Sequence, residues 1–253
     1  MNHYDVSILP SEARYWMMIL GAVVGGFLFV KYFDHLSKEK REPYLKRLGL
    51  ALICISSFLP IYTIVIPEHL FSFHRSLPLH FCSLNIWLIG LNCFFKSRKL
   101  FVYTFFMGLI GGFYSVLTPL LTVGDAPLVI VHYIIVHTAL FTVPIVMIRL
   151  YGMRLKYYDW IRGYLFAAAI STLMVLINSC LNLYVENTGG ASANYMFVTV
   201  APAVSNPFLF EGLQWPFYLF PIHLGLFLHM LIINMIYRKR EQNPIVSEPQ
   251  LWQ

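Results

Sequence analysis

Seven long apolar stretches dominate this chain of 253 residues and restrict what it can fold into. Each comes close to the length of about 20 residues that a helix needs to cross a bilayer. The composition agrees, because charged residues make up 12% of the sequence, whereas a soluble domain carries about 25%. We therefore predict a polytopic, all-α membrane protein with a single transmembrane domain, 1–253. Its seven helices are expected at residues 15–30, 48–66, 78–95, 100–123, 128–148, 163–185 and 216–237.

Lysine and arginine are distributed unevenly between the connections. Of the 18 basic residues, only Arg14 and Arg75 do not follow the first, third, fifth or seventh stretch. Because basic loops stay on the cytoplasmic side, we expect the N-terminus outside and the C-terminus in the cytoplasm, as a polar tail, 238–253. The net charge of +6 is therefore explained by the membrane topology. We expect membrane lipids and not nucleic acid as partners of a multi-pass cell-membrane protein, while the sequence identifies no protein partner.

The segment 186–215 is the one long connection, and we expect it outside the cell. Loops of this length are usually functional or disordered. Aromatic residues argue against disorder, and here they are Tyr195, Phe197, Phe208, Phe210 and Trp215. We expect the loop to lie at the outer membrane interface, where tyrosine and tryptophan are enriched.

Histidine, cysteine and asparagine are the notable polar residues of the predicted spans, since no Asp, Glu, Lys or Arg lies well inside one. The lack of a carboxylate argues against a proton pump or a cation carrier. With a rise of ~1.5 Å per residue, most of these groups fall in the outer half of the membrane. They are Cys82, Asn85, His132, Asn178 and His223, with His137 deeper. Their shared depth predicts one outward-facing polar cavity.

Prolines inside the predicted spans remove backbone donors and allow kinks. Ordinary kinked membrane helices account for most of them. Pro119 is the best candidate for a kink that opens a cavity, because the polar residues Tyr114, Ser115 and Thr118 surround it.

Cys82 can be interpreted in two ways. A thiol in apolar surroundings is inert unless a base takes its proton, and a histidine within hydrogen-bond reach would supply that base. Otherwise Cys82 is a small buried hydrophobe, and the histidines hydrogen-bond helices together. Depth pairs Cys82 with His132 more readily than with His137. A metal site built from His80, His132 and His137 would lack His-x-x-His spacing and an acidic partner, so we expect neither a metal nor a cofactor.

Four motifs occur in order between residue 77 and the end of the chain. They are LPLHFC at 77–82, GLIGG with LTP at 108–119, His137, and NYMF with WPFY at 194–218. In type, order and spacing they resemble the signatures of the YwaF-like family of bacterial integral membrane proteins. That family is in turn similar to a eukaryotic transmembrane acyltransferase that remodels ether phospholipids, for which a cysteine and a histidine are the proposed catalytic pair.

Carried over to this chain, the resemblance implies that Cys82 and His137 are the catalytic pair. Two departures concern the polarity of the cavity. The acidic or amide residue that usually follows the cysteine is Ser83 here. The glutamine and aspartate that flank L-T-P in many members are replaced by Tyr114 or Ser115 and by Leu120.

Our leading hypothesis is an acyltransferase that acts on lipid near the outer leaflet of a bacterial plasma membrane. Cys82 would form an acyl thioester, and His137 would act as base and then as acid. Asn85, Asn178 or Asn194 would donate hydrogen bonds to the oxyanion. The expected substrate-binding residues are His80, Asn85, His132, Asn178, Asn194, Tyr195 and His223. The rival hypothesis is a non-catalytic carrier or complex subunit, whose polar cluster binds a solute or holds helices together.

Overall fold

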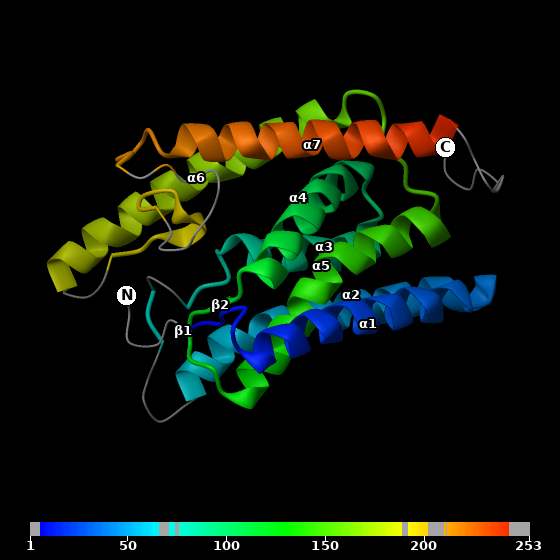
Figure 1. Ribbon diagram of the computed structural model, residues 1–253, viewed down its shortest axis with the longest axis horizontal. Helices are drawn as coiled ribbons and strands as arrows, with labels where there is room; N and C mark the ends of the chain where they lie inside the picture. The colour runs from blue at the N-terminus through cyan, green and yellow to red at the C-terminus, as the bar shows by residue number, and fades with distance from the viewer. Residues whose placement is uncertain are drawn as a thin grey trace.

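The computed structural model describes residues 6–65, 71–73, 76–188, 192–201, 210 and 212–242 (Figure 1). Apart from two strands of two residues each, the regular structure in these residues is helical, which confirms the all-α prediction. The α-helices are α1 (Ala13–Asp34), α2 (Lys38–Val65), α3 (Phe81–Phe95), α4 (Arg98–Leu117), α5 (Pro127–Tyr151), α6 (Asp159–Thr188) and α7 (Leu219–Gln242). Parts of the expected outer loop and residues 243–253 of the expected tail lie outside the described residues.

Six of these helices are long and apolar enough to cross a membrane, which supports a multi-pass membrane protein. The exception is α3, which has 15 residues. It rises only ~22 Å at ~1.5 Å per residue, whereas the hydrocarbon core is about 30 Å thick. The seven expected helices are therefore present, but seven full spans are not established.

The centre of the molecule is formed by α3, α4 and α5, which share the main apolar core. In Figure 1, α1 and α2 lie along one side of this centre, and α6 and α7 form a pair on the other side. Burial follows this arrangement. In α4 and in α5, half of the residues in the most apolar part of the helix are buried, compared with 17% in α6 and in α7. The outer helices therefore present large apolar faces that suit lipid.

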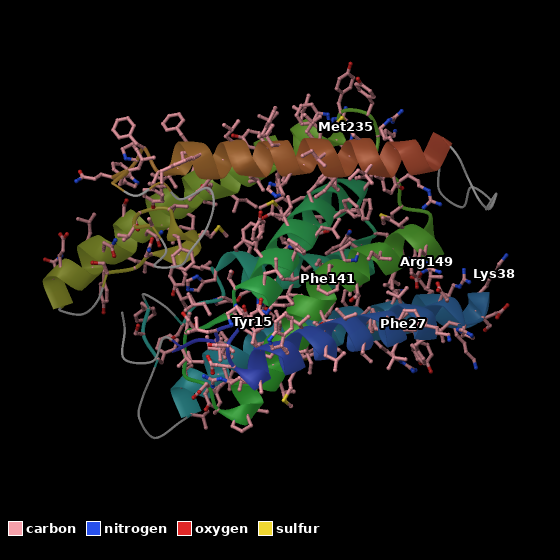
Figure 2. All side chains as sticks on the ribbon, viewed as in Figure 1. Tyr15, Phe27, Lys38, Phe141, Arg149 and Met235 are labelled. Carbon is pink, nitrogen blue, oxygen red and sulfur yellow. The ribbon has the colours of Figure 1, made fainter. Side chains whose placement is uncertain are left out.

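Figure 2 shows such side chains directly. Phe27 on α1 and Met235 on α7 point away from the helical body, with 64% and 54% of their surface exposed. Lys38 and Arg149 lie together near one end of the body, and Tyr15 lies toward the other. Arg149 pairs with Asp34 at 2.6 Å. Basic residues thus gather at one end, and the assignment of that end to the cytoplasm stays a prediction.

The fourth helix ends earlier than expected, and the predicted kink at Pro119 is wrong. α4 stops at Leu117, because a proline disfavours helical backbone in the residue before it, and Thr118 has φ −130° and ψ 68°. The chain then forms β2 (Leu120–Leu121), which pairs antiparallel with β1 (Val6–Ser7). This turn lies at the end of the helical body away from Lys38 and Arg149 (Figures 1 and 2).

Candidate functional site

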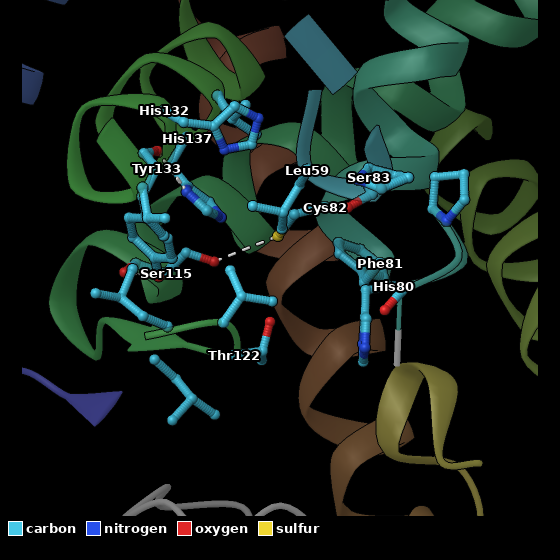
Figure 3. A pocket seen from close by; sticks show the side chains of 18 of the residues that line it. Leu59, His80, Phe81, Cys82, Ser83, Ser115, Thr122, His132, Tyr133 and His137 are labelled. Carbon is cyan, nitrogen blue, oxygen red and sulfur yellow. Dashed lines mark hydrogen bonds between the residues drawn. The ribbon is translucent and has the colours of Figure 1, made fainter. Parts of the chain in front are cut away.

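A cavity of about 360 Å³ lies at this same end of the central helices, beside α2 (Figure 3). Its polar groups include Cys82 from α3, Ser115 from α4, and His132 and His137 from α5, together with hydroxyl side chains of serine, threonine and tyrosine. Other lining residues come from the segment that follows α4 and from the outer loop, which contributes Met196 and Phe197. Among the described lining residues there is no Asp, Glu, Lys or Arg, so the cavity suits an uncharged group.

Cys82 is the second residue of α3, because the helix begins at Phe81 and not at residue 78 as expected. His80 has extended backbone angles (φ −64°, ψ 150°), and its carbonyl accepts the first helical hydrogen bond, from Leu84. The side chain of His80 makes no capping hydrogen bond to the start of α3. The first N–H groups of a helix have no partner within it and carry partial positive charge. The thiol of Cys82 therefore lies next to these N–H groups.

The thiol of Cys82 lies 3.3 Å from the hydroxyl of Ser115. The backbone carbonyl of Ser115 accepts a hydrogen bond of 2.8 Å from the hydroxyl of Tyr133, which fixes this last turn of α4 against α5. No hydrogen bond joins Cys82 to a histidine in the part of the chain that the structure describes. Ser115 is thus the immediate partner of the thiol, and the sequence pointed to it only through its position close to Pro119.

His137 presents one nitrogen to the cavity as a base. Its Nδ1 lies 2.7 Å from the carbonyl oxygen of Tyr133, which can only accept, so Nδ1 carries the proton and Nε2 does not. The ring also packs on Tyr133, with 3.8 Å between ring centroids. Figure 3 shows the imidazole and the Ser115 hydroxyl on the same side of the Cys82 thiol. A base, a hydroxyl and a thiol therefore converge in one cavity.

His132 lines the same cavity but also joins two helices. Its Nε2 donates a hydrogen bond of 2.9 Å to the carbonyl of Ile55 on α2, and its ring lies 5.2 Å from that of Phe58. The estimate from depth favoured His132 as the partner of Cys82. The structure places both histidines in the cavity wall, on the same side of the Cys82 thiol as Ser115 (Figure 3).

Three other expected site residues lie in different surroundings. His80 lines the mouth of the cavity, with its ring 5.0 Å from that of Tyr195. Asn85 is fully buried beside Gly108 and does not line the cavity, and neither of its amide atoms has a partner among the described residues. His223 lies 3.3 Å from the Ser171 hydroxyl, between α7 and α6.

The remaining candidates organise the outer loop. Asn178 on α6 donates to the carbonyl of Tyr195 (3.0 Å) and accepts from its N–H (2.9 Å). Asn182, which the sequence analysis did not single out, makes the same pair of bonds with Ala193. Asn194 accepts from the N–H groups of Thr199 and Val200 and donates to the carbonyl of Val200.

Tyr195 connects this loop to the segment before α3. Its hydroxyl donates to the carbonyl of Phe73 at 2.6 Å and accepts from the N–H of Leu77 at 3.0 Å. The side chain is fully buried, and burial raises its pKa to about 12, so it stays neutral and keeps both bonds. Tyr195 thus fixes the segment that precedes α3, the helix that carries Cys82.

A sequence model of the TMEM164 family matches residues 9–234, which is most of the chain. The chain belongs to the TMEM164 family. No curated protein and no solved structure matches it. The TMEM164 family is a family of transmembrane proteins, and all the candidate residues described above lie inside the matched range. The match also includes α1 and α2, which lie before the first of the motifs.

Proposed function

We propose that this member of the TMEM164 family is a lipid acyltransferase of the bacterial plasma membrane, with Cys82 as nucleophile and His137 as general base. The observation that carries the proposal is the convergence of the thiol with the unprotonated Nε2 of His137 in a cavity without formal charge. The resemblance to the YwaF-like family, and through it to an ether-phospholipid acyltransferase, supports the same pair.

The first half of the reaction transfers an acyl group to sulfur. His137 takes the proton of the Cys82 thiol, with Ser115 as a relay that accepts the thiol proton and gives its own to the imidazole. The sulfur attacks the carbonyl carbon of an ester, and the bond from that carbon to the ester oxygen breaks. The leaving alcohol takes the proton from His137, and an acyl thioester remains on Cys82.

The second half returns the enzyme to its starting state. An acceptor alcohol gives its proton to His137 and attacks the thioester carbonyl, and the bond from carbon to sulfur breaks. His137 then returns the proton to the sulfur. The products are the new ester and the free thiol, so no oxidant, reductant or cofactor is needed.

The backbone at the start of α3 is the best source of oxyanion stabilisation. The N–H groups of its first turn are uncapped and adjoin the nucleophile, as in other acyl-transfer sites. Asn178 and Asn194 are engaged in the outer loop, and Asn85 lies outside the cavity lining. We therefore replace the three asparagines of the sequence hypothesis with these backbone groups.

One observation favours the rival function of a carrier. Asn85 and Asn92 lie seven residues apart on α3, both are fully buried, and both have an amide oxygen without a partner among the described residues. Residues at this spacing share a face of the helix. Together with Cys82, they form a polar line that leads from the cavity toward the opposite membrane face.

Trapping the acyl enzyme distinguishes the two functions. The purified protein is incubated with a phospholipid that carries an alkyne-tagged acyl chain, and the tag is located by mass spectrometry of peptides. An enzyme should carry a hydroxylamine-sensitive tag on Cys82, absent from Cys82→Ser and retained in Cys54→Ser, whose cysteine is exposed on α2. A tag that persists in Cys82→Ser, or an untagged wild type that moves solute across vesicles, would favour the carrier.

A further inference from the structure

A second cavity, of about 200 Å³, lies between α4 and α7, next to the start of α3. Met107, Ile110 and Gly111 form its wall on α4, and Ile222 and Leu226 form its wall on α7. Neither the motifs nor the mechanism above gives this cavity a role.

The two cavities share two side chains, Phe81 and Tyr114. Phe81 precedes Cys82, and in Figure 3 it lies on the side of the thiol opposite Ser115 and His137. Its ring lies directly on Gly111, where an added Cβ would be only 2.5 Å from Phe81 Cε1. The ring can therefore occupy the wall between the cavities only because residue 111 has no side chain.

The polar groups of the second cavity are paired with each other. His229 Nδ1 donates to the carbonyl of Gly225 at 2.7 Å, so its Nε2 is the acceptor for the Tyr114 hydroxyl at 3.0 Å. The other described lining residues are apolar or glycine. A cavity whose polar groups are already satisfied favours hydrocarbon over a polar solute.

We propose that this second cavity binds the distal part of the acyl chain whose carbonyl carbon reacts at Cys82, with Phe81 as the partition that the chain displaces. The placement of the carbonyl rests on the proposed function, whereas the binding of a hydrocarbon chain does not. His137 and the Ser115 hydroxyl lie on one side of the Cys82 thiol. The apolar second cavity lies on the other side, next to Phe81, and there it can take a hydrocarbon chain. The size of residues 81 and 111 then sets which chains are accepted.

Photo-crosslinking tests chain binding without turnover. The Cys82→Ser protein is placed in lipid vesicles that contain a phospholipid with a diazirine near the methyl end of a palmitoyl chain. We expect crosslinks on residues 222–229 and 107–111 that fall about tenfold when Leu226→Trp fills the cavity, because each buried methylene is worth about a fourfold change in binding. Leu224→Trp is the matched control, since Leu224 is 59% exposed on the same helix and outside the cavity lining.

The outcomes separate this inference from the proposed function. Equal labelling in the two tryptophan variants, or crosslinks confined to α5 and residues 118–123, would overturn the second chain site. A thioester on Cys82 without these crosslinks would leave the acyltransferase standing and remove the chain site. The expected crosslinks without any thioester on Cys82 would support the chain site and contradict the acyltransferase. If both hold, Phe81→Ala should shift the active protein toward longer or bulkier chains, and Gly111→Ala toward shorter ones.

Discussion

The cavity around Cys82 and the hydrogen-bonded outer loop use similar residues in opposite ways. In the loop, the side chains of Asn178 and Tyr195 are fully buried, and each is bonded to backbone groups. In the cavity, His137 keeps one nitrogen free. Buried polar groups that are all satisfied stabilise one conformation, whereas a group left free beside a cavity is available to a ligand. The comparison assigns structure to the loop and chemistry to the cavity.

The largest expected effect is an all-or-none difference in cysteine labelling, which tests on which side of the membrane the loop and the cavity lie. Single cysteines are introduced into a variant in which the four native cysteines are replaced by serine. A membrane-impermeant thiol reagent applied to intact cells should label a cysteine at Asn194 and leave one at Arg154 unlabelled, because basic loops stay in the cytoplasm. The reverse pattern would move both regions to the cytoplasmic leaflet.

His137→Gln should give the largest change in rate. Removing a general base costs about 10²–10⁴-fold, and glutamine leaves the apolar packing of α5 largely intact. The initial rate of thioester formation on Cys82 measures the loss. His132→Gln is the matched control in the same cavity wall, and we expect a milder loss because the proposed mechanism takes the thiol proton through His137, whereas His132 joins α5 to Ile55 on α2. Equal losses in the two variants would remove the distinction between them.

The overall rate of acyl transfer from the tagged phospholipid to an acceptor alcohol, which is defined for every variant, tests whether the pair acts as one unit. If Cys82 and His137 form one catalytic unit, the double variant should react no more slowly than the slower single variant, because such groups are strongly non-additive. Independent, multiplying losses would instead indicate that His137 acts through the fold of α5.

The sequence predicted the helices well because hydropathy and length are local properties. Depth along the membrane normal also grouped Cys82 with His132, which line one cavity, whereas it placed His137 deeper, and His137 became a candidate through the family resemblance. Depth does not say on which side of a bundle a helix lies. Asn178 and His223 lie on the α6–α7 pair and do not line the cavity. Asn178 bonds to Tyr195 of the loop, and His223 lies beside Ser171 of α6.

Two local details also escaped the sequence analysis, and both depend on tertiary contacts. The start of α3 follows a segment that Tyr195 holds from far along the chain. The protonation of His137 is set by a carbonyl in its own helix, but its direction toward Ser115 depends on how α4 packs on α5. The paired strands at β1 and β2 are too short for a periodic signal.

Asn178→Ala should weaken the loop by a measurable but smaller amount. It removes two hydrogen bonds and leaves the N–H and carbonyl of Tyr195 buried without partners, which costs about 1–3 kcal/mol in unfolding free energy. Thermal unfolding in detergent measures the change. Asn187→Ala is the control on the same helix, because Asn187 is exposed and donates to the carbonyl of Leu183 one turn earlier. Loss of activity with unchanged unfolding in Asn178→Ala would contradict the structural role of the loop.

The smallest effect is expected at an exposed ion pair that holds the segment around β1 and β2. Arg14 lies 2.5 Å from Asp125, and this hydrogen bond keeps the pKa of the Asp125 carboxyl below its usual value. A lowered carboxyl pKa stabilises the fold above the pKa of the unfolded chain, and this contribution disappears as the pH falls through the folded value, below about 4. Arg14→Gln should therefore lower the melting temperature at pH 7, and the difference from the wild type should shrink as the pH falls into the acid range. The shift at pH 7 should be small, because solvent screens exposed pairs. A large shift at pH 7 would instead place this segment, which continues into the cavity wall, among the parts of the molecule on which the fold depends.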